Sequence, residues 1–281
     1  TQGNIEQGIK WNETYAENTF QVYEKLTLDA GNDEPDLIVW PETASTVYLK
    51  YDKNYMERVC KLAKRNGIDM LIGTPDANVD ENWKVKEYYN SAFLITRKGE
   101  LTSKYDKIHL VPFGEYVPLA NHLKFLEKYT VGYSNFSKGK EYKLFNTERG
   151  DNFSVLICWE IIFPELCREF TSKGANFLIT ISNDAWYRRS AASYQHFITL
   201  PFRAIENRVN VARAANTGIS GFVNYKGEII KYLDIFIKDK LTAQISLYKS
   251  GTFYKSYGDV FAICSISAAL FGLFFVRKKK D

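Results

Sequence analysis

The sequence has few residues of the kind that bind metals, and those it has are not spaced as ligands. Four cysteines and three histidines occur in 281 residues, and none forms a CxxC pair, an HExxH motif or a comparable spacing. They are Cys60, Cys158, Cys167, Cys264, His109, His122 and His196. We therefore expect neither a bound metal nor another cofactor.

An excess of one charge is also missing. Lysine and arginine number 37 against 33 aspartates and glutamates, and much of the net charge of +4 lies in the last few residues. A nucleic-acid partner is therefore not expected. Disorder and a small disulfide scaffold are not expected either, because 45% of the residues are hydrophobic and 15% aromatic, which is enough for one large core.

The GxSxG motif of many serine hydrolases is absent too, which leaves a cysteine as the candidate nucleophile. Residues 153–157 are apolar and predict a strand buried on both faces, and Cys158 follows directly. Glu160 stands two residues further on, which indicates that the chain has reached a polar cleft. The alternative is that Cys158 is a small hydrophobic residue of the core, as many unpaired cysteines in apolar runs are.

Strands and helices alternate along the chain, which is typical of an α/β sandwich. Several predicted strands end at polar residues, among them Glu42 after Pro41, and Asn183 with Asp184. Apolar periodicity predicts helices at residues 9–28, 55–66, 164–173 and 195–207, and strands at 37–40, 68–73, 89–96, 175–182, 209–214 and 218–224. The polar residues 76–86 predict a surface loop.

The thiol needs a base or a positive field, and two charged residues could supply them. Glu42 could take the proton of Cys158 and return it to a leaving group; its alternative role is a surface or helix-capping acid. Lys107 could stabilise first the thiolate and then an oxyanion, although most lysines are solvated surface charges.

Residues 107–118 contain too many prolines for a helix and too many aromatic residues for an ordinary loop. Within them Glu115 could orient Lys107 or help to move protons, or it could be an ordinary loop carboxylate. Glu160, and Asn183 with Asp184, could support the reacting groups, or their hydrogen bonds could only fix loops.

The C-terminal end differs from the rest of the chain in its charge pattern. Residues 260–276 carry no charge, and a helix of that length reaches roughly 25 Å, near the short limit of a membrane span. Residues 277–280 are all basic, and such clusters normally stay cytoplasmic. We therefore expect a periplasmic catalytic domain at residues 1–250, a linker at 251–259, a transmembrane helix at 260–276 and a cytoplasmic tail at 277–281. The alternative is a buried terminal helix of a soluble protein.

Several runs of the sequence resemble the carbon-nitrogen hydrolase, or nitrilase, superfamily. They are PETA at 41–44, KIHLVPFGEYVP at 107–118, ICWEIIFP at 157–164 and ISNDAW at 181–186. Within the superfamily they are most similar to the apolipoprotein N-acyltransferase family. That similarity extends over nearly the whole chain through QGNI at 2–5, Trp11, QH at 195–196, RAIEN at 203–207 and NTGIS at 216–220.

The resemblance implies a fold, a site and a reaction. The fold would be an αββα sandwich, with Glu42 as base, Lys107 as oxyanion stabiliser, Cys158 as nucleophile and Glu115 as a further essential acid. A fatty acyl chain would leave a phospholipid, expected to be phosphatidylethanolamine, to form a thioester on Cys158. The α-amine of a diacylglyceryl-cysteine in an apolipoprotein would then accept it.

The resemblance also implies a place in the cell. The enzyme would lie in the bacterial inner membrane with its catalytic domain in the periplasm. Trp11 and residues 119–136 would lie near a mouth that faces the membrane.

The sequence departs from that family in two respects. Members usually carry several transmembrane helices before the QGN motif, so we expect this chain to be the C-terminal portion of a longer protein. Members also commonly have Tyr after the nucleophile and Phe-Gly after Asp-Ala-Trp, where this sequence has Trp159 and Tyr187-Arg188. Loop geometry and acceptor contacts are therefore expected to differ.

Two other functions fit the same residues. A membrane-tethered amidase or nitrilase-type hydrolase would use Glu42, Lys107 and Cys158 with water as the acceptor. A catalytically silent binding module would instead leave these side chains more than about 8 Å apart.

Overall fold

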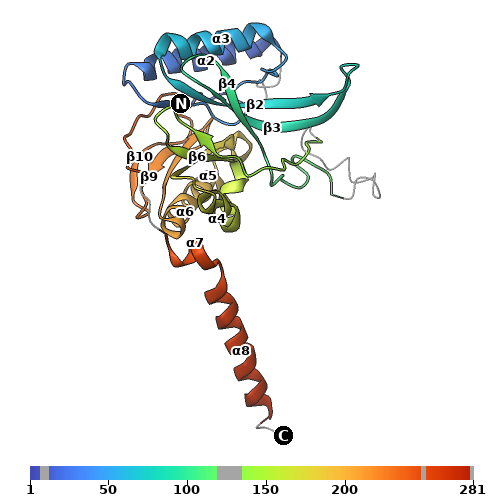
Figure 1. The fold of residues 1–281 in the computed structure, drawn as a ribbon, viewed down its shortest axis with the longest axis vertical. Coiled ribbons are helices and arrows are strands. Elements are labelled where there is room, and N and C mark those ends of the chain that lie inside the picture. The colour runs from blue at the N-terminus through green and yellow to red at the C-terminus, as the bar shows by residue number, and fades with distance from the viewer. Residues whose placement is uncertain (7–12, 119–134, 248–250, 279–281) are drawn as a thin grey trace.

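A computed structural model describes residues 1–6, 13–118, 135–247 and 251–278 of the chain. In these residues, two β-sheets pack face to face and helices cover the outer face of each (Figure 1). Apolar side chains of both sheets, such as Leu94 and Val155, meet in the core between them. The expected αββα arrangement of an α/β sandwich is therefore confirmed.

The first sheet has the strand order β1-β2-β3-β4. Its strands are Leu37–Val39, Asp69–Val79, Val85–Ile95 and Leu101–Asp106. β1 is parallel to β2, and the other neighbours are antiparallel. Helices α2 (Glu13–Gly31) and α3 (Lys53–Asn66) lie over its outer face, where they bury Tyr23, Trp40 and Phe93 in a second core (Figure 1).

The second sheet has the order β10-β9-β8-β7-β6-β5. In chain order, β5 to β10 are Phe145–Asn146, Asn152–Ile157, Phe177–Ser182, Asn210–Ala215, Ser220–Val223 and Ile229–Leu233. β6, β7 and β8 are parallel neighbours, so their carboxyl ends meet at one edge of the sheet. Helices α4 (Pro164–Ser172), α5 (Ala191–Phe197) and α6 (Thr199–Asn207) complete this half of the sandwich.

Helix α3 shows how local sequence sets an element's limits. The side chain of Asp52 accepts hydrogen bonds from the backbone N–H groups of Asn54 and Tyr55 at the first turn. Gly67 ends the helix with φ of 65°, a left-handed conformation that glycine adopts without a Cβ penalty. The helix stop at this glycine was readable from the sequence because both signals are local.

Two expected elements were wrong. Residues 76–86 do not form one long loop, because β2 and β3 continue into a long antiparallel hairpin with residues 80–84 as its turn (Figure 1). The ladder satisfies the backbone groups there, so burial on one face is not required. Residues 195–207 lie in two helices, α5 and α6, which meet at Ile198.

The C-terminal part begins with α7 (Phe253–Tyr257), inside the stretch expected to be a linker, and continues as α8 (Val260–Lys278). Figure 1 shows α8 projecting away from the sandwich. Its apolar side chains are exposed, among them Phe261, Ile263, Ile266, Leu270, Phe271 and Leu273. Over the described residues, however, no helix combines the length and the apolarity that crossing a bilayer requires. The transmembrane helix at 260–276 therefore stays a prediction.

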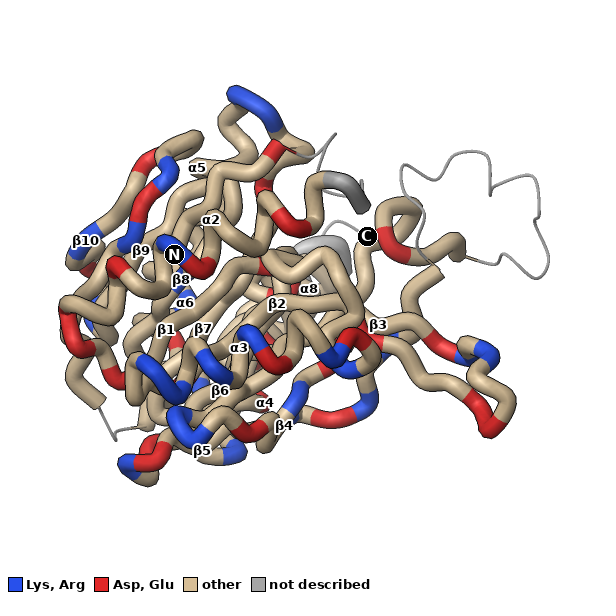
Figure 2. The backbone as a smooth tube through the Cα atoms, turned by 90° about the horizontal axis from the view of Figure 1, so that it is seen from above, with Lys and Arg blue, Asp and Glu red and all other residues tan. Residues whose placement is uncertain are grey.

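Charged residues of both signs are interspersed along the backbone rather than collected by sign (Figure 2). The ion pairs of Arg58 with Glu17 at 2.6 Å and with Glu24 at 2.7 Å illustrate the mixing. This distribution offers no extended basic face of the kind that binds nucleic acid within the described part of the chain.

Candidate active site

The nucleophile candidate lies where the parallel strands end. Cys158 follows β6 directly and begins a 3₁₀ helix, η2 (Cys158–Ile162). Its φ is 55°, a left-handed conformation that costs a non-glycine residue energy and that the surrounding structure must enforce. The thiol is 9% exposed, so it is held in the core yet reachable from a cavity.

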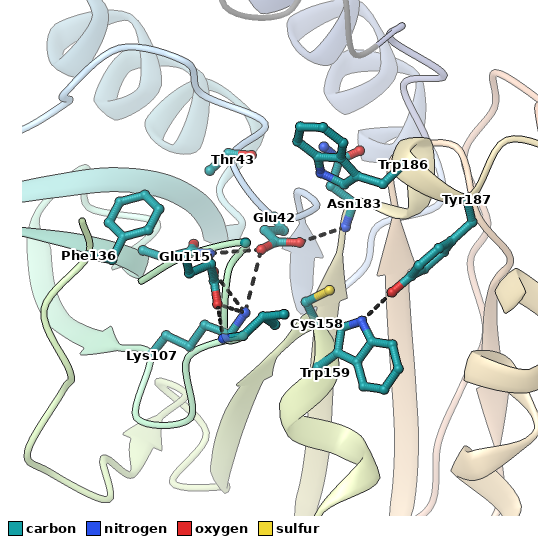
Figure 3. Close-up of a pocket in the computed structure, with 13 residues that line it drawn as sticks. Glu42, Thr43, Lys107, Glu115, Phe136, Cys158, Trp159, Asn183, Trp186 and Tyr187 are labelled. Atoms are coloured by element: carbon teal, nitrogen blue, oxygen red, sulfur yellow. Dashed lines mark hydrogen bonds and ion pairs between the residues drawn. The ribbon is translucent and has the colours of Figure 1, made fainter. Parts of the chain in front are cut away.

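Glu42, Lys107 and Cys158 line one cavity of about 350 Å³ and point into it from three distant segments (Figure 3). Glu42 follows β1 and Pro41, and Lys107 follows β4. The other lining residues are Thr43, Asn90, Val111, Gly114, Glu115, Phe136, Trp159, Asn183, Trp186 and Tyr187. The alternative of a catalytically silent binding module required these three side chains to lie apart. They instead line the same cavity.

The acidic groups of the cavity are joined by one amide. Nδ2 of Asn90 donates to Glu42 Oε1 at 2.8 Å and to Glu115 Oε1 at 3.0 Å. The second oxygen of Glu42 accepts from the backbone N–H of Asn183 at 2.8 Å, and that of Glu115 accepts from the N–H of Val111 at 2.9 Å. Uncharged donors therefore help to fix both carboxylates in place.

Lys107 is the positive centre of the site. Its side chain is 1% exposed, and Nζ lies 4.0 Å from Glu42 Oε1. Burial disfavours the charged ammonium, but the fields of Glu115 and Glu42 outweigh burial and raise the pKa of Lys107. The side chain is therefore a permanent cation at a buried position, where a charge acts strongly on a developing oxyanion.

The thiol of Cys158 is not activated at rest. Burial, and secondly the charge of Glu42, raise its pKa, although Lys107 opposes the shift. A neutral thiol predominates at neutral pH, so attack on a carbonyl requires a base that removes the proton during the reaction. Glu42 is the carboxylate whose field reaches the sulfur most strongly.

Glu160 ties the two reacting segments together. One of its oxygens accepts from the backbone N–H groups of Ile108 at 2.7 Å and His109 at 3.0 Å, and from the hydroxyl of Tyr105 at 2.8 Å. The other accepts from the N–H of Ile157 at 2.7 Å. Burial raises its pKa to about 7. Glu160 thus braces the Lys107 segment against the Cys158 turn.

Asn183 also contacts this machinery. Its backbone N–H donates to Glu42 Oε2, while its side-chain oxygen accepts from Nδ2 of Asn216 at 2.9 Å. The ring of His109 packs on Phe163, with centroids 4.6 Å apart. Trp11 and residues 119–134 lie outside the described residues. Phe136, just beyond them, lines the cavity.

Trp159 and Tyr187, two positions at which the sequence departs from the family pattern, are in contact. The indole N–H of Trp159 donates to the hydroxyl of Tyr187, and together they form the wall of the cavity beside Cys158 (Figure 3). Trp186, 54% exposed, stands at the rim. The cavity lining therefore combines four aromatic residues with polar and charged ones.

Sequence reasoning named Asp184 but missed the rest of a polar network beneath Cys158. Ser182 donates to Asp184 Oδ1 at 2.7 Å, and its oxygen lies 3.5 Å from the sulfur. His196 and Arg213, both nearly fully buried, complete the network. The available signal was an arginine inside the otherwise apolar residues 211–215, since a buried charge requires a partner.

In the described part of the chain, Cys158, Asp184 and His196 bring metal-ligand types together, with ligand atoms within 4.8 Å of one another. Arg213, however, already donates to Asp184 at 2.8 Å. A cation bound here would face this guanidinium at close range, so the donor set fits a metal poorly. The expectation that no metal binds stays a prediction.

Comparison with known proteins agrees with the fold. The model of the family described as carbon-nitrogen hydrolase matches residues 2–254. Structures of an amidase from Nesterenkonia sp. AN1, of the nitrilase superfamily, superpose with a TM-score of 0.60 at 20% identity, covering 78% of this chain and 82% of the amidase. At that identity the likeness shows the fold alone.

Relatives with a higher sequence identity than the amidase are named apolipoprotein N-acyltransferases. An apolipoprotein N-acyltransferase of Geobacter metallireducens is 40% identical over 280 residues, 99% of this chain and 53% of that protein. Apolipoprotein N-acyltransferase 2 of Treponema denticola is 32% identical over 95% of this chain and 53% of that protein. The chain thus spans about half the length of the curated relatives it matches.

Proposed function

The chain belongs to the carbon-nitrogen hydrolase family, and on that premise we propose that it catalyses acyl transfer in the maturation of bacterial lipoproteins. It moves a fatty acyl chain from a phospholipid, through a thioester on Cys158, to the N-terminal amine of a diacylglyceryl-cysteine. The observation that carries the proposal is the shared cavity of Glu42, Lys107 and Cys158 in a chain 40% identical to an acyltransferase.

In the first half-reaction, Glu42 removes the thiol proton of Cys158 as the sulfur attacks the ester carbonyl of the phospholipid. The carbonyl π electrons move onto oxygen, and Lys107 stabilises the oxyanion. When the tetrahedral intermediate collapses, the ester C–O bond breaks. Glu42 returns the proton to the departing alkoxide, which leaves as a lysophospholipid and frees the base for the second step.

In the second half-reaction, the neutral amine of the acceptor attacks the thioester carbonyl. Glu42 takes a proton from the nitrogen, Lys107 again stabilises the oxyanion, and the C–S bond breaks as the amide forms. The thiolate of Cys158 recovers the proton from Glu42. Each group thus ends in the state in which it began, which closes the cycle.

The proposal places the catalytic domain in the periplasm and α8 in the inner membrane. Its support is the uncharged run at 260–276, the exposed apolar side chains along α8 and the basic residues that follow. A donor that resides in the bilayer, here proposed to be phosphatidylethanolamine, would then be within reach of a tethered enzyme. A cavity with aromatic walls is suited to an acyl chain.

Incubation with phosphatidylethanolamine vesicles, followed by intact-mass measurement, tests the proposal. We expect a fatty-acyl adduct that is lost in Cys158→Ala and discharged by a diacylated lipopeptide bearing a free N-terminal amine. Turnover of small amides without any adduct would instead establish a tethered amidase. Cys264→Ala is the matched control, since Cys264 lies on α8 and should leave the adduct unchanged.

A further inference from the structure

We infer that His196 is a positioning residue for the oxyanion site, acting through the peptide that joins Cys158 to Trp159. This inference rests on the proposed thioester chemistry. Nε2 of His196 lies 3.1 Å from the carbonyl oxygen of Cys158. Nothing in the comparisons assigns a role to this histidine, which the reaction itself does not use.

The contact fixes more than one atom. A peptide unit is rigid and planar, and in its trans form the C=O and the N–H point in opposite directions. Holding the carbonyl of Cys158 towards His196 therefore aims the N–H of Trp159 the other way. Trp159 is the second residue of η2, where the N–H has no partner within the helix. That N–H is available as a second donor to an oxyanion, alongside Lys107.

The restraint acts on the torsion that aims the N–H of Trp159. The φ of Cys158 is 55°, and rotation of the following peptide about the Cα–C bond of Cys158 would leave that φ unchanged but turn the N–H of Trp159 away from the reacting carbonyl. A hydrogen bond from His196 to the buried carbonyl of Cys158 opposes this rotation. His196 thereby preserves the orientation of the N–H of Trp159.

The chemistry of the contact determines the tautomer of His196. A carbonyl oxygen can only accept, so Nε2 must carry the hydrogen. Burial, and secondly the charge of Arg213, lower the pKa of His196, so the ring is neutral at neutral pH. Nδ1 is then an acceptor, and Nη2 of Arg213 lies 3.0 Å from it. Arg213 thus selects the tautomer that can donate to Cys158.

The rest of the network holds His196 and Arg213 in place. Nη2 of Arg213 also donates to Asp184 Oδ2 at 2.8 Å, and its Nε donates to the carbonyl of Ile219 at 3.1 Å. Asp184 Oδ1 lies 3.2 Å from His196 Nδ1, and because both atoms are acceptors in this tautomer, it is the guanidinium of Arg213, in contact with both side chains, that holds them together. The indole of Trp159 stacks on the His196 ring with centroids 6.0 Å apart. Contacts from several elements therefore fix the ring plane.

Two small electrophiles separate positioning from a merely structural role. Acylation of Cys158 by p-nitrophenyl acetate passes through an oxyanion, whereas alkylation by iodoacetamide is a displacement that forms none. For His196→Leu we expect acylation to slow by about tenfold to a hundredfold, in the range for a weakened oxyanion donor, while alkylation changes by less than about threefold. His109→Leu, at the other described histidine, should change neither rate.

His196→Gln is the rescue variant, since its amide N–H can replace Nε2–H; we expect acylation within about threefold of wild type. Equal losses of acylation and alkylation in both His196 variants would reduce the residue to a structural role and overturn the inference. Wild-type acylation in folded His196→Leu would overturn it too, as would Gln failing like Leu while folded. Neither reagent is a lipid, so the outcome is independent of the phospholipid assay.

Discussion

Both carboxylate oxygens of Glu115 contact the ammonium nitrogen of Lys107, at 2.9 and 2.8 Å. Glu42 lies further away, at 4.0 Å from the same nitrogen. Because Glu115 takes most of the neutralising contact with Lys107, Glu42 stays available to accept the proton of Cys158. The two carboxylates therefore have different roles, although Asn90 donates a hydrogen bond to each of them.

Replacing Glu115 with Gln should slow thioester formation by about tenfold to a hundredfold. The substitution keeps the size of the side chain but removes the charge that most strongly supports the ammonium of Lys107, so Glu42 should be drawn towards Lys107 and act less well as a base. Time-resolved intact mass after mixing with phospholipid measures the rate. Glu81→Gln, at an exposed carboxylate, is the control. An unchanged rate would refute this division of roles.

Lys107→Ala should abolish the acyl-enzyme even where the protein folds. It removes the permanent cation of the cavity, and the N–H of Trp159 by itself does not offset the loss of that charge next to the oxyanion. The fatty-acyl adduct on Cys158, measured by mass, is the readout. Lys61→Ala, which alters a 76% exposed side chain, should give a normal yield. A normal thioester yield in Lys107→Ala would show that its role is misassigned.

The stability of the protein should carry a pH dependence due to Glu160. Burial raises its pKa to about 7 in the folded protein from an ordinary 4.5. The folded protein keeps a proton that the unfolded chain loses, so this contribution is complete below about pH 4.5 and is lost as the pH rises through about 7. The shift corresponds to on the order of 3 kcal/mol.

Urea unfolding at several pH values between 4.5 and 8, for wild type and Glu160→Gln, measures this contribution. The uncharged amide cannot titrate, so the difference in unfolding free energy between the two proteins should change across that range. Parallel curves would contradict the raised pKa. Glu165→Gln, a carboxylate on the neighbouring α4, serves as the control because its charge is not in this network.

The contact between Trp159 and Tyr187 should act as one unit in substrate binding. Tyr187→Phe and Trp159→Phe each remove one partner of the same hydrogen bond, so their effects on KM should not add. A double-mutant cycle should show a coupling of about 1 kcal/mol, with kcat changed less than KM. Additive effects would mean that the two side chains contribute to the wall independently.

Several features of the site followed from short stretches of sequence. The apolar run before Cys158, the proline before Glu42 and the proline-rich segment that begins at Lys107 each mark a strand end or a loop by local rules. The hairpin at 76–86 could not be predicted by such rules. A polar strand that extends beyond the sandwich lacks a buried face, so its sequence resembles that of a loop. The division of residues 195–207 into α5 and α6 likewise left no break in the apolar pattern.

The sequence by itself determined the α/β alternation, the strand ends and the identity of the reacting groups, because strand burial, turn chemistry and side-chain type are properties of neighbouring residues. Only the tertiary structure decided that Asn90 joins two carboxylates, that Cys158 rests as a neutral thiol and that His196 and Arg213 lie beneath it. The reason is that burial and electric field depend on groups brought together from distant segments, and no local pattern records that distance.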